Sequence, residues 1–176
     1  MKLYVIRHGQ TNSNIYEKLL SITDEDLNNY GYKQIQKVKK SLKDINFDIC
    51  FSSNYKRTIN TANIIIDNKC NLIVDNRLNE RNFGILEGAK DKLYTEDFWN
   101  YYLNKHDYNV EPLRNLFDRT DDFLTFLKNN YKDKTVLVVS HAATIRAIHY
   151  NIMGFDESTN MLSFNVDNGK ILTYEL

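Results

Sequence analysis

Short, continuous runs of apolar residues are the feature that most constrains how this chain of 176 residues can fold. They stand at four places, Leu3–Ile6, Ile49–Phe51, Leu72–Val74 and Thr135–Val139. The runs are rich in β-formers and do not alternate with polar residues, which is the pattern of strands covered on both faces. They therefore predict a largely parallel sheet whose two faces are buried.

Helical patterns separate these runs. One segment carries a stripe of Ile35, Val38 and Leu42, and a later one carries a longer stripe at the same period. Cap and turn residues mark the ends of the four predicted helices: Asn28 and Ser53 as N-caps, Pro112 near a start and Gly154 as a C-cap. Strands that alternate with helices predict an α/β domain.

The end of the chain differs from the rest. Residues 161–176 read as two strands around a turn at Asp167, Asn168 and Gly169. Two strands joined by a short turn are antiparallel. The sequence therefore predicts an antiparallel edge on the mainly parallel sheet.

Composition narrows the class of protein. The 23 basic and 23 acidic residues cancel, so we expect neither nucleic acid nor a membrane surface as a partner. No apolar stretch approaches a transmembrane span, and the first run is too short for a signal peptide. Cys50 and Cys70 are too few for a disulfide framework, so we expect reduced thiols in a cytoplasmic protein. The length predicts a single domain, 1–176, and nothing predicts its oligomeric state.

Charged and polar side chains follow the strands where the strands end. Those directly after a strand are Arg7, His8, Ser52, Ser53 and His141. Arg57 lies near the start of the following helix, and Glu80 lies in the loop after the third strand. The carboxyl ends of parallel strands share one edge of a sheet, and a helix N-terminus attracts anions. These residues therefore predict a pocket for a dianion, with phosphate as the favoured ligand.

Four motifs carry a resemblance to a known family. In chain order they are RHGQT with Asn14 beyond it, SSNYKRTINTA, LNERNFGILEG and VVSHAATIR. Together they resemble the histidine phosphatase superfamily, also called the phosphoglycerate-mutase-like family, over nearly the whole chain. The resemblance implies a three-layer α/β/α sandwich with a short helical cap insert at about 89–119.

The resemblance also implies a role for each matching residue. His8 matches the nucleophile that becomes phosphorylated, and Glu80 matches the acid that protonates the leaving oxygen. The groups that hold the phosphoryl oxygens are matched by Arg7, Arg57 and His141, and further phosphate- or substrate-binding positions by Asn14, Arg81 and Ala142. Two guanidiniums and a second histidine can balance the charge that magnesium balances in kinases, so we expect no metal and no cofactor.

One departure from the family pattern concerns the backbone beside the second histidine. The family commonly has glycine where this chain has Ala142. Alanine is strained there if the position needs a positive φ, and serves equally well if it needs only a backbone N–H at negative φ.

Three functions fit this sequence. The first is a metal-independent phosphomonoesterase that acts on small phosphorylated metabolites through a phosphohistidine. The second is a cofactor-dependent phosphoglycerate mutase, and the third is a non-catalytic sensor of a phosphate ligand. The short chain favours the phosphatase, because the mutases of this family are longer, whereas Arg81 beside Glu80 favours the mutase. Cations of the insert are further candidates for contact with a second acidic group, although a solvated surface explains most of them: Lys90, Lys92, Lys105, His106 and Arg114.

Overall fold

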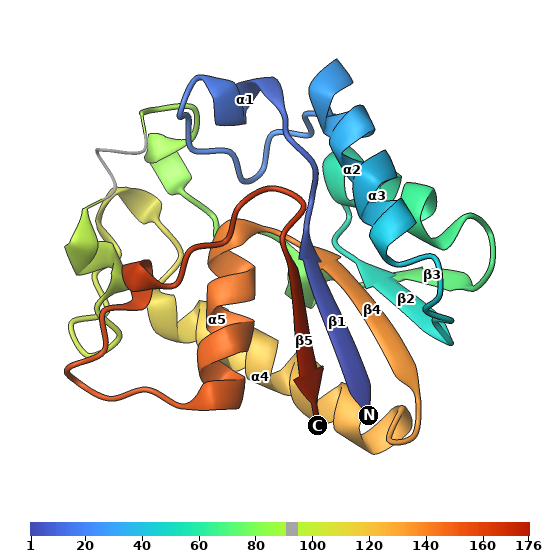
Figure 1. Cartoon of the computed structure of the whole chain (residues 1–176). Helices are drawn as coiled ribbons and strands as arrows, with labels where there is room; N and C mark the ends of the chain where they lie inside the picture. The colour runs from blue at the N-terminus through green and yellow to red at the C-terminus, as the bar shows by residue number, and fades with distance from the viewer. Residues whose placement is uncertain (91–94) are drawn as a thin grey trace.

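A five-stranded sheet forms the centre of the computed structural model, which describes residues 1–90 and 95–176. Its strands are β1 (Lys2–Arg7), β2 (Ile49–Ser52), β3 (Asn71–Val74), β4 (Thr135–Ser140) and β5 (Ile171–Glu175). They lie in the order β3-β2-β4-β1-β5 (Figure 1). β5 runs antiparallel to β1, and the other neighbouring pairs are parallel. The predicted sheet, mainly parallel with an antiparallel edge, is confirmed.

Helices cover both faces of the sheet and complete the three layers (Figure 1). They are α2 (Asn29–Ser41) and α3 (Lys56–Ile66) on one face, and α4 (Leu113–Asn130) and α5 (Ala142–Met153) on the other. Along β1, Leu3 and Val5 join the core under α4 and α5, while Tyr4 and Ile6 join the core under α2 and α3. The apolar runs of β1, β2 and β4 are continuous because each of these strands supplies both cores. The run Leu72–Val74 was wrongly predicted to be covered on both faces: β3 is an edge strand, and its Ile73 and Val74 are exposed. No helix in the described ranges is long and apolar enough to cross a membrane.

Two of the predicted helix caps are confirmed and one is wrong. Asn28 caps α2 by accepting a hydrogen bond from a backbone N–H of the first turn at 2.8 Å, and Gly154 ends α5 with a φ of 80°. The N-cap of α3 is Tyr55, which makes no side-chain capping bond. Ser53 does not cap this helix, because its hydroxyl is hydrogen-bonded to His141 at 2.8 Å.

The prediction of two strands around residues 167–169 is half correct. The turn leads into β5, but Met161–Ser163 before it forms a 3-10 turn. The segment before the turn is held by side-chain packing instead of a sheet ladder, since the ring of Phe164 stacks on His149 with centroids 3.6 Å apart.

The insert is built mostly of short turns. Its 3-10 turns are Glu96–Trp99 and Asp107–Asn109, and residues 113–119 already belong to α4. The predicted boundary at 119 therefore falls inside a helix that packs against the sheet. The part of the insert at 91–94, which includes Lys92, lies outside the described residues.

The strand register brings the site residues to one level. Arg7 pairs with Ser140 across β1 and β4, and Ser52 pairs with Val139 across β2 and β4. The residues that follow these pairs therefore leave the sheet side by side at its carboxyl edge, beneath the short helix α1 (Asn12–Ile15) at the top of Figure 1. The chain after His8 runs so close to α2 that a Cβ on Gly31 would lie 2.2 Å from the Gln10 carbonyl oxygen.

Candidate active site

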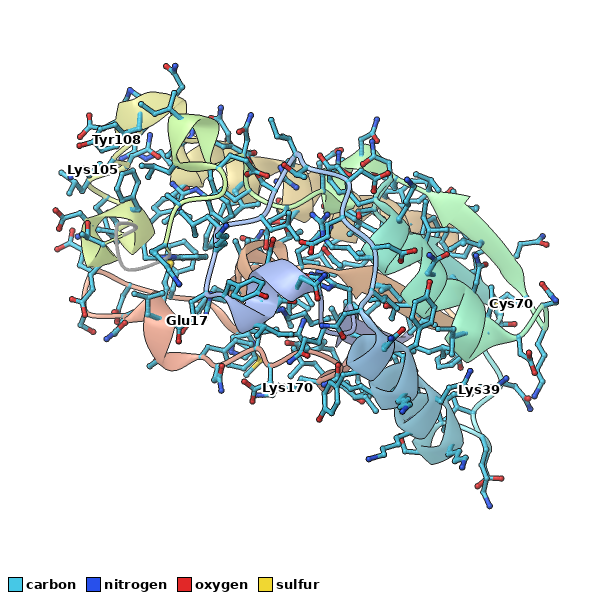
Figure 2. All side chains as sticks on the ribbon, turned by 90° about the horizontal axis from the view of Figure 1, so that it is seen from above. Glu17, Lys39, Cys70, Lys105, Tyr108 and Lys170 are labelled. Carbon is cyan, nitrogen blue, oxygen red and sulfur yellow. The ribbon has the colours of Figure 1, made fainter. Side chains whose placement is uncertain are left out.

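A cavity of about 510 Å³ opens at the carboxyl edge of the sheet. Five of the predicted site residues line it: Arg7, His8, Asn14, Glu80 and Ala142. Figure 2 looks down on this edge; Glu17, which lines the cavity, lies in the left half of the view, and Lys39 and Cys70 lie in the right half. The three remaining predicted residues, Arg57, Arg81 and His141, are fully buried, with His141 next to His8.

His8 is a buried, neutral imidazole with one free nitrogen. Its Nδ1 lies 2.8 Å from the carbonyl oxygen of Gly9, and only a protonated Nδ1 can donate to that oxygen. The lone pair is therefore on Nε2. Burial lowers the pKa of His8 well below its ordinary value, with Arg7 and Arg57 acting in the same direction. Neutral imidazole with a free Nε2 lone pair is the form in which histidine is a nucleophile.

His141 stands beside His8, with the ring centroids 5.1 Å apart and the planes at 63°. Its Nδ1 accepts a hydrogen bond of 3.3 Å from Nε of Arg57. Its Nε2 therefore carries the proton and donates to Ser53 Oγ at 2.8 Å. Burial and then Arg57 lower the pKa of His141 well below its ordinary value. Both ring nitrogens of His141 are occupied, in contrast to those of His8.

The hydroxyl of Ser53 fixes this orientation of His141. Ser53 Oγ lies 2.6 Å from Thr58 Oγ1, which itself donates to the carbonyl of Tyr55 at 2.8 Å. Ser53 therefore donates to Thr58 and accepts from His141. The chain of bonds runs in one direction and ends on the backbone.

We expect Ser53→Ala to leave the Nε2–H of His141 without an acceptor. An unsatisfied buried donor costs about 1–3 kcal/mol of unfolding free energy, and the loosened ring lowers turnover by roughly 10- to 100-fold. Ser52→Ala is the matched control, since Ser52 is equally buried but donates to the Ser53 carbonyl. Urea denaturation and steady-state rates measure both variants. Equal turnover of the two would contradict the role assigned to Ser53.

Two guanidiniums lie at this site without a carboxylate partner. Arg7 donates from Nη1 to the Val166 carbonyl at 2.6 Å, and its buried Nε has no partner in the described structure. Burial lowers the pKa of Arg7 to about 10. Arg57 donates to the carbonyls of Ser21 and Thr23 at 2.8 and 2.9 Å. None of the ion pairs in the described ranges includes either arginine. Buried cations of this kind are suited to a bound anion.

The carboxylate of Glu80 lies over the first turn of α5. Oε1 accepts from the backbone N–H of Thr144 at 3.2 Å, and Oε2 from that of Ala143 at 3.3 Å. Ala142 is the first residue of α5 and is not among the described residues with positive φ, so alanine is unstrained there. The helix N-terminus, the acid and His141 thus adjoin one another.

Asn14 is oriented by two neighbours so that its amide N–H groups are available. Its Oδ1 accepts from the backbone of Thr11 at 3.0 Å and from Nδ2 of Asn168 at 3.1 Å. Asn168 also donates to the carbonyl of His8 at 2.9 Å, which ties the turn before β5 to the strand end. The sequence showed Asn168 only as a turn residue, because its contact depends on the pairing of β5 with β1.

Arg81 takes a different place from the predicted one. It is fully buried, donates from Nε to the carbonyl of Glu111 at 2.8 Å, and donates from Nη1 to that of Phe98 at 2.5 Å. These contacts tie the loop of Glu80 to the insert. The guanidinium is engaged with the insert backbone and does not stand among the cavity-lining groups.

Several residues that line the cavity were not selected from the sequence. Arg146 lies one turn beyond Ala142 on α5, donates to the Phe164 carbonyl at 3.0 Å and stands 5.0 Å from the ring centre of Trp99. The sequence could have indicated Arg146 through its position four residues after Ala142 in a predicted helix, a spacing that places two residues on the same helix face.

The insert residues Lys90, Lys105, His106 and Arg114 lie outside the cavity lining. Figure 2 shows Lys105 on the outer side of the insert.

The buried histidines predict how stability depends on pH. The unfolded chain protonates His8 and His141 near pH 6.5, whereas the folded chain resists protonation because both pKa values are lowered. The unfolding free energy is therefore constant above about pH 7 and falls below pH 6.5, by up to about 1.4 kcal/mol per pH unit for each histidine. Burial also lowers the pKa of the half-buried His149, which adds to the loss of unfolding free energy at low pH.

Urea denaturation at pH 7, 6 and 5 measures how steeply the unfolding free energy falls with pH. We expect this slope to be shallower in His8→Ala. An unfolding free energy that stays constant between pH 7 and 5 is the contrary result.

The chain as a whole matches a known family and several proteins of known name. The model of the histidine phosphatase superfamily, branch 1, matches residues 3–176. The uncharacterized phosphatase PhoE of Bacillus subtilis is 32% identical over 174 residues, covering 93% of this chain and 85% of PhoE. The 2,3-bisphosphoglycerate-dependent phosphoglycerate mutase of Arthrobacter sp. is 27% identical over 215 residues, covering 99% and 86%. The crystal structure of a phosphoserine phosphatase from Entamoeba histolytica in complex with 3-phosphoglyceric acid matches with a TM-score of 0.84 and 28% identity, covering 98% of this chain and 89% of that one.

Proposed function

Because this chain belongs to the histidine phosphatase superfamily, branch 1, we propose that it is a phosphomonoesterase acting on small phosphorylated metabolites through a phosphohistidine. One observation carries the proposal. A neutral imidazole with a free Nε2 lone pair adjoins two guanidiniums, the partly buried Arg7 and the fully buried Arg57, which have no carboxylate partner in the described structure. This arrangement suits attack on a phosphorus atom whose oxygens are held by cations.

In the first step, Nε2 of His8 attacks the phosphorus and the ester P–O bond breaks. The equatorial oxygens are held by Arg7 and Arg57, with the amide of Asn14 and the backbone N–H of Ala142 as further donors. Glu80 gives its proton to the departing alkoxide oxygen, which leaves as an alcohol. The products of this step are the free alcohol and phosphorylated His8.

In the second step, water attacks the same phosphorus and the P–N bond breaks. The Glu80 carboxylate takes the proton from the water, which restores the acid for the next cycle. His8 returns to its neutral form and inorganic phosphate leaves. One difficult displacement is thereby divided into two easier ones.

We propose that the chemistry is independent of metal ions. The guanidiniums of Arg7 and Arg57 supply the positive charge that stabilises the transferring phosphoryl group. The backbone N–H of Ala142, at the N-terminus of α5, adds a donor on the same side.

The test is a panel of metabolite phosphates incubated with the purified protein in chelator, with free phosphate and isomerised product scored separately. We expect phosphate release. Isomerisation of 3-phosphoglycerate that depends on 2,3-bisphosphoglycerate would favour the mutase. If the protein binds a phosphate ester but forms neither product and no phosphohistidine, the result would favour the non-catalytic sensor.

A further inference from the structure

We propose that Glu87 is a positioning residue for the phosphate-binding Arg57, acting through the backbone of residues 21–23. The proposal rests on the proposed function in one respect, that Arg57 holds phosphoryl oxygens. Glu87 lies just after the 3-10 turn Gly84–Leu86, on the loop that also carries Glu80, and no role follows for it from the chemistry above.

Both oxygens of the Glu87 carboxylate form hydrogen bonds with residues 21–23. Its two oxygens lie 3.0 and 2.9 Å from the backbone nitrogen of Ser21, and Oε2 accepts from Ser21 Oγ at 2.5 Å. Oε1 also accepts from the backbone nitrogen of Thr23 at 3.0 Å. None of the ion pairs in the described ranges includes Glu87.

The same two residues hold Arg57 from the opposite side. Their carbonyl oxygens accept from Nη2 and Nη1 of Arg57 at 2.8 and 2.9 Å. The segment 21–23 therefore presents its N–H groups to an anion and its carbonyls to a cation. The bonds to Glu87 and to Arg57 together fix the orientation of this segment, and the segment in turn fixes the plane of the Arg57 guanidinium. Since Nε of Arg57 also donates to His141, a tilt of this plane would disturb both groups.

Glu87 and the strap 21–23 are also connected by neighbouring bonds. Ser21 Oγ accepts from the backbone nitrogen of Phe83 at 3.2 Å, so its position is set by the same loop. On the other side of the strap, Gly88 donates to the Leu19 carbonyl at 2.8 Å. These bonds attach residues 21–23 to the loop that carries Glu80, so the position of Arg57 depends on the position of that loop.

A positioning role and a purely electrostatic role have opposite consequences. Glu87 is one of the negative groups that raise the pKa of Arg57, against the larger lowering caused by burial. Neutralising Glu87 makes the pocket more positive, so electrostatics alone predicts tighter binding of an anion. If Glu87 positions Arg57, the same change weakens anion binding, because a Gln amide would turn its NH₂ toward the backbone N–H groups of the strap.

The experiment compares wild type, Glu87→Gln and the matched control Glu25→Gln. Glu25 likewise accepts a backbone N–H with both oxygens, from Ser13 at 3.2 and 3.3 Å, and this carboxylate makes no bond to residues 21–23 or to Arg57 in the described structure. Only the backbone N–H of Glu25 contacts the segment, at the Thr23 carbonyl at 3.0 Å, and the substitution leaves that group in place. The probe is orthovanadate, which mimics the transferring phosphoryl group, and its affinity is measured by calorimetry with the thermal midpoint of each variant. Turnover is followed on whichever metabolite phosphate the panel identifies.

We expect Glu87→Gln to weaken vanadate binding and to lower kcat, each by about tenfold or more, with KM changing less. Glu25→Gln should match the wild type in both. Unchanged or tighter vanadate binding in Glu87→Gln would overturn the positioning role, and so would equal losses in the two variants. A wild type that binds vanadate without releasing phosphate would defeat the proposed function alone, and the vanadate comparison would still decide the role of Glu87.

Discussion

Replacing His8 with alanine is expected to abolish turnover, with a loss of roughly 10⁴-fold or more, as for removal of a nucleophile in other covalent enzymes. The reason is specific to the lone pairs at this site. His8 has a free Nε2, whereas His141 has Nδ1 bonded to Arg57 and Nε2 bonded to Ser53. The second imidazole therefore cannot take over the attack, although it stands next to the first.

The measurement has two parts. Steady-state phosphate release gives the loss of activity, and base-quenched peptide mapping locates the phosphohistidine in the wild type. We expect the label on His8. We also expect His8→Ala to bind vanadate and to unfold at a similar temperature, because in the described structure the hydrogen bond of the His8 imidazole goes to the adjacent Gly9. Label on His141, or more than about 1% residual activity in His8→Ala, would contradict the assignment.

Replacing Glu80 with glutamine is expected to give the second largest effect, and its size should depend on the leaving group. An alkyl phosphate needs a proton on its departing oxygen, so kcat/KM should fall by about 10²- to 10⁴-fold. A nitrophenyl ester leaves as a stable anion, so its kcat/KM should change little. Glutamine has nearly the shape of glutamate, and Thr144 N and Arg81 N can still donate to its oxygen.

The comparison of the two esters separates acid catalysis from binding. Loss of an interaction that only holds the phosphoryl group would lower kcat/KM equally for both. With the nitrophenyl ester, Glu80→Gln should release a burst of nitrophenol followed by a slow phase, because hydrolysis of the phosphohistidine loses its base. Equal losses with both esters would rule out the role of Glu80 as acid.

The fold and the centre of the site could be predicted because both follow from strand ends. Continuous apolar runs placed β1, β2 and β4, and parallel register placed the residues after them at one edge. His8, Arg57 and His141 are brought together in this way, across separations of up to 133 residues along the chain (8 to 141). No local pattern was needed beyond the position of each residue at a strand or helix end.

The remaining contacts could not be predicted because they depend on side-chain direction in irregular segments. Arg81 is adjacent to Glu80 in sequence, yet it bonds to the insert backbone, and nothing periodic in a loop fixes that direction. Serine is a common N-cap residue, but the side chain of Ser53 bonds to His141, which is 88 residues away in the chain. Glu87 binds a segment that lies 66 residues earlier in the chain, and no local pattern in the sequence connects the two.

The sheet order has a consequence for how the chain acquires its activity during synthesis. β1 is synthesised well before its two sheet neighbours, β4 and β5, with Lys2 pairing with Thr135 and Glu175. Loop closure over such distances is slow, and it cannot begin until these later strands have been made. A nascent or truncated chain therefore holds the nucleophile on an unpaired, apolar strand. Catalytic competence is acquired in the last step of assembly, so incomplete chains are expected to be inert toward phosphate esters.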